Sequence, residues 1–117
     1  MREILFRGKR KDNEEWVYGD LVHWADGMIK IETIYDEWEI IPETLGQFAG
    51  LLDKNGTKIY EGDIVKEPYG LGWEGIVIFE KGQFIVDIGS RWIPMWEYIE
   101  VIGNIHEENN NGTTAND

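Results

Sequence analysis

The stretch that most constrains the fold is a pair of glycine turns between residues 50 and 65. Asp53-Lys54-Asn55-Gly56 has the composition of a tight turn, because an aspartate at the first position accepts backbone N–H groups and Asn-Gly tolerates positive φ. Apolar residues flank this turn, which predicts a connection between two strands. Glu61-Gly62-Asp63 then turns the chain again into Ile64-Val65. Two turns so close together leave room only for short strands in this region.

The rest of the chain also has the pattern of short strands. β-Branched and aromatic residues gather in short segments bounded by turn signals such as Asp26-Gly27 and Lys81-Gly82. We expect strands at 3–8, 15–23, 28–34, 35–41, 64–66, 75–80, 83–88 and 99–105. Residues 42–45 predict one short helical turn, because proline is tolerated where a helix begins.

This pattern predicts a mainly β chain. No segment has helix periodicity long enough to cover a sheet, so the sheet must bury its apolar face against itself. We therefore expect a small SH3-type barrel over residues 48–106, with the N-terminal antiparallel strands and the short helical turn packed on it. The length of 117 residues fits one domain, which we place at 1–106. Residues 107–117 are predicted to be a disordered acidic, Asn-rich tail, because they contain almost nothing apolar.

The spacing of the glycine turns carries a resemblance to a known family. The residues concerned are Gly50, Asp53, Asn55, Gly56, Tyr60, Gly62 and Asp63. The chain resembles the YopX family, small proteins encoded by phages and prophages, and the likeness runs through residues 2–107. The resemblance implies the same barrel and a phage or prophage setting, and it brings no established activity with it. Glu14 where the family has glycine, and Ala49 where threonine is more familiar, depart from the pattern without touching chemistry.

The same seven residues have a physical interpretation that needs no function. The glycines suit positions of positive φ or close backbone approach. Asp53 is expected to cap its own turn, and Asp63 to brace the second corner. We therefore predict that the motif is structural.

The charge balance limits the kinds of partner that the chain can bind. Eleven Lys and Arg against 23 Asp and Glu give a formal net charge of −12. Such a field repels a phosphate backbone, so no direct nucleic-acid binding is expected. The one basic cluster, residues 7–11, is predicted to be a solvated hairpin tip. No apolar run approaches the ~18 residues of a membrane helix, so we expect no membrane partner and a cytoplasmic location in a bacterial host.

Catalytic and metal motifs are missing from the sequence. The chain has no cysteine, which excludes thiol catalysis and thiolate metal sites and fits a reducing compartment. His23 and His106 lack the spacing of a zinc site, and the loop after Asp53 does not match a calcium loop. Glu61 and Asp63 lie two apart, as paired catalytic carboxylates do, but this spacing is common in so acidic a chain. We expect no enzyme activity, no cofactor and no metal.

Tryptophan is unusually abundant. Six tryptophans exceed what one small core usually needs, and tryptophan is favoured at interfaces because its ring buries a large area. Trp16, Trp38 and Trp92 lie in strand patterns and are predicted core residues.

The remaining candidates lie on and near a glycine-rich loop. Tyr69 and Trp73 on this loop, Trp96 after the next proline, and the acidic Glu74 form a candidate binding surface. Such a surface suits a basic or proline-containing segment of a protein partner. The same rings are also suited to covering the open end of the barrel, which would leave them no binding role.

Three functions therefore stay open. A non-catalytic protein-interaction module would dock through the loop at residues 69–74. An acidic decoy that mimics nucleic acid would occupy the basic groove of a host protein and inhibit it. A self-assembling structural protein would form homo-oligomers through exposed sheet edges.

Overall fold

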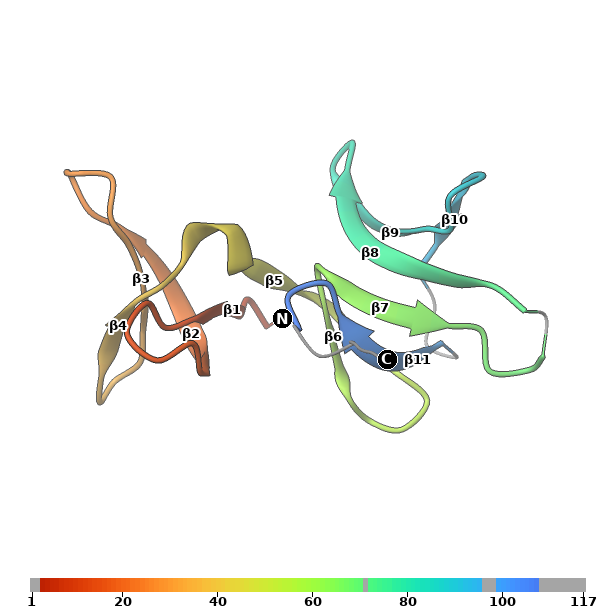
Figure 1. Ribbon diagram of the computed structural model, residues 1–117, viewed down its shortest axis with the longest axis horizontal. Coiled ribbons are helices and arrows are strands. Elements are labelled where there is room, and N and C mark those ends of the chain that lie inside the picture. The colour runs from red at the N-terminus through yellow and green to blue at the C-terminus, as the bar shows by residue number, and fades with distance from the viewer. Residues whose placement is uncertain (1–2, 71, 96–98, 108–117) are drawn as a thin grey trace. The chain divides into compact units, whose positions relative to one another are not determined.

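The computed structural model describes residues 3–70, 72–95 and 99–107 (Figure 1). Within these ranges the chain forms antiparallel strands and one short 3-10 turn, so the expectation of a mainly β chain is confirmed. The elements are β1 (Phe6–Lys9), β2 (Trp16–His23), β3 (Ile29–Glu32), β4 (Glu37–Glu39), η1 (Pro42–Thr44), β5 (Gly46–Leu52), β6 (Lys58–Tyr60), β7 (Asp63–Lys66), β8 (Glu74–Glu80), β9 (Gln83–Asp87), β10 (Trp92–Pro94) and β11 (Glu100–Asn104).

The strands form two antiparallel sheets. One has the order β4-β3-β2-β1-β5-β6, and the other has the order β10-β9-β8-β7-β11. The chain divides into two compact units, Met1–Gly50 and Leu51–Asp117, which we call the N-terminal unit and the C-terminal unit. The boundary therefore falls inside β5. The expectation of one domain over residues 1–106 stays a prediction.

The SH3-type barrel expected over residues 48–106 is not confirmed. Among the described strands, β10 and β11 stand at the two edges of their sheet, and β6 pairs with β5 in the other sheet. β10 has only three residues and ends at Pro94, which has no N–H to donate to a further strand. The strands that were expected to close on one another are thus divided between two open sheets.

The core of the N-terminal unit forms between hairpin strands. β1 pairs with β2, β2 with β3, and β3 with β4, all antiparallel. Val17, Ile31 and Ile40 form the buried cluster, and partly buried side chains pack against it, including Trp38 as the sequence predicted. Ile40 packs closely against Gly8, since a Cβ at this position would lie 2.5 Å from Ile40 Cδ1 and 3.2 Å from Ile40 Cβ.

Only the end of the basic cluster at residues 7–11 lies at the solvated hairpin tip that was expected, because Lys11 is exposed in the turn after β1. Arg7 and Lys9 are buried in β1, on the same face as their cross-strand partners Tyr18 and Trp16. The Arg7 guanidinium and the Lys9 ammonium lie 4.6 and 5.6 Å from the centroid of the Trp16 ring. Cation–π contact of this kind contributes to holding the two cations against the ring.

The core of the C-terminal unit lies on one face of the β7–β8–β9 sheet. The register sets Val77 opposite Val86 and Val65 opposite Gly75, so their side chains point to the same side. All three valines are fully buried. Alternation of the strands sends the intervening residues to the other face, where the candidate site lies.

One buried carboxylate joins distant parts of this unit. Asp53 is 6% exposed, and its Oδ1 accepts the N–H groups of Asn55 at 2.8 Å and Thr57 at 2.9 Å. Its Oδ2 accepts the N–H of Val101 in β11 at 2.9 Å. Asp53 therefore caps the turn after β5 and also binds that turn to β11. In the second corner, buried Asp63 accepts the N–H of Tyr60 at 2.8 Å.

The protonation of Asp53 is set by two opposing effects. Burial raises the pKa of this carboxyl, but the three backbone N–H donors outweigh burial and hold the pKa below its ordinary value. The charged form is therefore the one that the folded chain favours.

We predict that Asp53→Ala destabilises the C-terminal unit by about 1–3 kcal/mol, because three backbone N–H groups lose their acceptor. Urea unfolding followed by tryptophan fluorescence measures the effect. Asp26→Ala is the matched control, since Asp26 accepts one N–H, from Met28, in an exposed turn. Its cost should be about 0.5 kcal/mol or less. Equal costs for the two variants would contradict the role assigned to Asp53.

The lowered pKa of Asp53 also predicts a pH dependence. The stability from its charged form is fully present above the unfolded pKa of about 3.9 and is lost as the pH falls through the lower folded pKa. The free energy of unfolding of the wild type should therefore exceed that of Asp53→Asn by a margin that narrows below about pH 4. Urea titrations of both proteins at a series of pH values measure this margin. A margin that stays constant with pH would show that the charge of Asp53 is not what stabilises the fold.

Candidate functional site

The loop between β7 and β8 holds Tyr69 out to solvent. Tyr69 is 66% exposed, and its backbone N–H donates to Glu67 Oε2 at 2.6 Å. The N–H of Glu67 in turn donates to the carbonyl oxygen of Trp73 at 3.2 Å. The buried Glu67 carboxylate therefore holds the backbone at the start of the loop, where the exposed Tyr69 lies.

The other candidate binding residues have different surroundings. Trp73 is half-buried at the end of the loop, and Glu74 is exposed at the first position of β8. Trp96 lies outside the described residues. Trp92, predicted to be a core residue, is instead 47% exposed in β10, opposite Asp87 of β9. Tyr69, Trp73 and Glu74 thus belong to one loop and the strand that it enters.

A largely apolar hollow of about 400 Å³ opens where this loop enters β8. Its lining comes from three adjacent strands and the two residues after β9, and comprises Ile64, Glu74, Gly75, Ile76, Asp87, Ile88 and Gly89. The register sets Ile64 opposite Ile76, and Ile76 opposite Asp87, so these side chains share one face of the sheet. This face is opposite to the valine core.

Two carboxylates stand at this hollow. Asp87 Oδ1 accepts the N–H of Gly89 at 2.8 Å, which fixes the side chain at the end of β9. Glu74 makes no side-chain hydrogen bond or ion pair with the residues that the structure describes. Lys66 faces Glu74 in the register, but its Nζ lies 3.8 Å from Glu100 Oε1. Neither carboxylate is therefore neutralised by a lysine or arginine within the described part of the chain.

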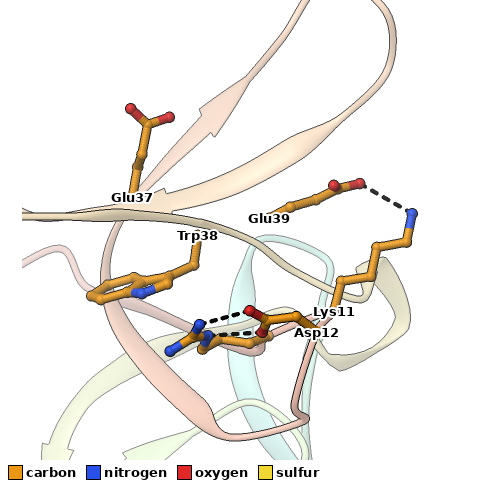
Figure 2. Close-up of a pocket in the computed structure, with 6 residues that line it drawn as sticks. Lys11, Asp12, Glu37, Trp38 and Glu39 are labelled. Carbon is orange, nitrogen blue, oxygen red and sulfur yellow. Dashed lines mark hydrogen bonds and ion pairs between the residues drawn. The ribbon is translucent and has the colours of Figure 1, made fainter.

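A second hollow, of about 380 Å³, lies in the N-terminal unit (Figure 2). It is lined by Arg10, Lys11, Asp12, Glu37, Trp38 and Glu39. The Nε and Nη2 groups of Arg10 donate to the two carboxylate oxygens of Asp12 at 2.9 and 2.7 Å. Figure 2 shows a further ion pair, from Lys11 Nζ to Glu39 Oε2, at 3.1 Å. The charged side chains that line this hollow therefore already have ion-pair partners.

These pairs make the second hollow a weaker candidate for binding. The hydrogen bond to Arg10 lowers the pKa of Asp12, and the hydrogen bond to Glu37 raises the pKa of Lys30. The Lys30 to Glu37 contact is 2.6 Å. A charged ligand would have to displace one of these partners, whereas the hollow of the C-terminal unit offers carboxylates without such competition.

Sequence reasoning missed one exposed apolar feature in the N-terminal unit. Ile34 and Tyr35, expected in strands, lie in the turn between β3 and β4 and are 89% and 85% exposed. Thr33 Oγ1 accepts the N–H groups of Tyr35 and Asp36, both at 3.1 Å. A threonine that can bond the backbone two and three residues later was the available signal for this turn.

Among the described residues, no group of three or more His, Cys, Asp or Glu side chains is placed to hold a metal ion. No helix among these residues is long and apolar enough to cross a membrane. Asp63, which the sequence placed beside Glu61 as a possible carboxylate pair, is buried and accepts the N–H of Tyr60, so it serves the corner.

The model of the YopX protein family matches residues 5–111. The chain belongs to the YopX family. The resemblance inferred from the glycine turns is therefore confirmed, and the YopX match spans both units.

A solved structure is similar to this YopX-family chain along most of its length. The crystal structure of protein EF1440 from Enterococcus faecalis is 22% identical, with a TM-score of 0.54, over 92% of this chain and 96% of that chain. Likeness at this identity concerns the fold alone. No curated protein matches the chain.

We predict that Gly75→Ala crowds the buried valine core behind the apolar hollow, because a Cβ there would lie 2.6 Å from Val86 Cγ1 and 2.7 Å from the Asp87 carbonyl oxygen. Crowding of this kind costs about 1–3 kcal/mol of unfolding free energy. Gly103→Ala is the control in the same sheet, since no atom lies within 4 Å of its added Cβ. Chemical denaturation compares the two variants. A Gly75→Ala protein as stable as Gly103→Ala would rule out this close approach of β8 and β9.

Proposed function

We propose that this YopX-family chain is a non-catalytic protein-interaction module that binds a segment of a partner protein through its C-terminal unit. The observation that carries the proposal is the apolar hollow beside the loop that exposes Tyr69. Glu74, at the junction of loop and hollow, belongs to both.

The size and lining of the hollow favour a short segment of polypeptide. Its volume of about 400 Å³ falls at the small end of the roughly 300–1,000 Å³ typical of ligand sites. Isoleucines supply apolar area, and a few polar groups at the rim would fix the orientation of what binds. Exposed aromatic rings beside such a groove favour proline-containing segments, which lose little entropy on binding.

The decoy function finds less support in the distribution of charge. In the N-terminal unit, Asp12, Glu37 and Glu39 are each paired with a lysine or arginine, which breaks up a continuous acidic surface there. A mimic of nucleic acid needs a run of uncompensated negative charge. Self-assembly through sheet edges stays a further outcome of the experiment below.

We predict that affinity capture from a bacterial host lysate, treated with nuclease, retains one protein partner at both low and high salt. Tyr69→Ala and Trp73→Ala should each weaken this capture about tenfold or more, as truncation of an aromatic anchor does. Quantitative mass spectrometry of the eluted protein measures the change. Trp24→Ala is the matched control, because Trp24 is also half-exposed but lies in the N-terminal unit.

Three other outcomes would contradict the proposal. A nucleic-acid-processing partner that is lost steeply with salt would indicate the decoy, since screening weakens exposed charge pairs. Recovery of the bait alone, with a dimer or ring in solution, would indicate self-assembly. Undiminished capture by the well-folded Tyr69→Ala variant would exclude the loop, and because Tyr69 is exposed this variant is expected to fold.

A further inference from the structure

We infer that the apolar hollow of the C-terminal unit selects an arginine side chain of the partner. The aliphatic stem would lie across the isoleucines, and the guanidinium would lie between Glu74 and Asp87. The inference rests on the proposed function and names the residue that the partner must supply. It also assigns specificity to Asp87, which the sequence did not single out.

The floor of the hollow matches the stem of a long cationic side chain. Ile64 and Ile76 face each other across β7 and β8, and Ile88 follows at the end of β9. Arginine and lysine bury their methylene groups along apolar surface while the charged end stays near water. A purely apolar side chain would use this floor but leave both carboxylates without a partner.

The two carboxylates are spaced for a forked donor. Glu74 lies two residues before Ile76, and Ile76 is opposite Asp87, so the two acids are diagonal neighbours on adjacent strands. Diagonal pairs on one face have side chains about 7–8 Å apart at their base. The planar guanidinium presents five N–H donors in a fixed fork and can bond both carboxylates at once, whereas an ammonium is a compact point charge.

The surroundings of Asp87 further favour arginine. The Gly89 N–H occupies Asp87 Oδ1, which leaves Oδ2 for a ligand. Trp92, about half exposed, is opposite Asp87 in the register, and a guanidinium stacks well on an indole. Lys66 is drawn to Glu100, and neither Lys66 nor Arg91 lines the hollow, so the described chain places no cation of its own there.

The test uses the whole chain labelled with 13C at isoleucine δ1-methyl groups, because isoleucines form the floor. The probe is the peptide acetyl-Leu-Arg-Pro-amide, and its comparison is the same peptide with citrulline, which has the shape of arginine without the charge. Titration should shift the methyl signals of Ile64, Ile76 and Ile88, while buried Ile31 and Ile40 of the N-terminal unit stay unchanged. The citrulline peptide should bind about fivefold more weakly or worse.

Variants that remove one negative charge test whether Glu74 and Asp87 bind the arginine side chain. Glu74→Gln and Asp87→Asn should each weaken binding of the arginine peptide by about two- to fivefold and reduce its advantage over citrulline. Asp87→Asn keeps an oxygen for the Gly89 N–H, so the turn is retained. Glu80→Gln is the matched control, because Glu80 lies exposed at the far end of the same strand and outside the hollow.

Several outcomes would overturn the inference. These are equal affinity for the arginine and citrulline peptides, equal affinity for a lysine peptide, or no methyl shift at the solubility limit of the probe. Partner capture separates this inference from the proposed function. Capture that depends on Tyr69 and Trp73 but not on the two carboxylates would support the interaction module and exclude arginine as the residue that it selects. Capture that depends on none of the four residues would exclude both the proposed function and the arginine inference.

Discussion

The C-terminal unit depends on the Asp53 carboxylate and the three N–H groups that it accepts. Two of these donors shape the turn after β5, and the third belongs to Val101, 48 positions further along the chain. This long contact fixes β11 beside the turn, and β11 pairs with β7. Since β7 supplies Ile64 to the apolar hollow, a single buried charge supports the strand from which the candidate site is built.

The two units use charge in different ways. In the N-terminal unit, buried cations lie over an indole ring and the acids around the hollow have basic partners within a few residues or across a strand. In the C-terminal unit, Glu74 and Asp87 stand at an apolar surface without such partners among the described residues. The net charge of −12 is therefore a poor guide to binding. The recognition that we propose depends instead on two carboxylates that stand beside an apolar hollow without a cation among the described residues.

Features encoded by neighbouring residues could be predicted from the sequence, and those set by distant pairing could not. The turn at residues 53–56 follows from Asp and Asn-Gly alone, and the 3-10 turn follows from Pro42. Only the end of β5, next to the turn at residues 53–56, was predicted, because Gly46 is a local signal for a break while pairing with β1 holds the start of the strand extended. Trp92 was placed in the core because alternation gives two faces without saying which one is buried. Closure into a barrel was not confirmed, because closure depends on which distant strands pair, and local sequence does not specify this.

The family motif and the candidate site occupy different parts of the C-terminal unit. The glycines and aspartates at residues 50–63 shape the turns that lead into β7. The aspartate side chains accept hydrogen bonds from backbone N–H groups. The hollow begins only at Ile64 and takes its other residues from β8 and β9. Because Asp53 and Asp63 are already engaged in the fold, they offer little to a ligand. The aspartates of this motif serve the fold, and the recognition that we propose therefore rests on Glu74 and Asp87, which the motif does not contain.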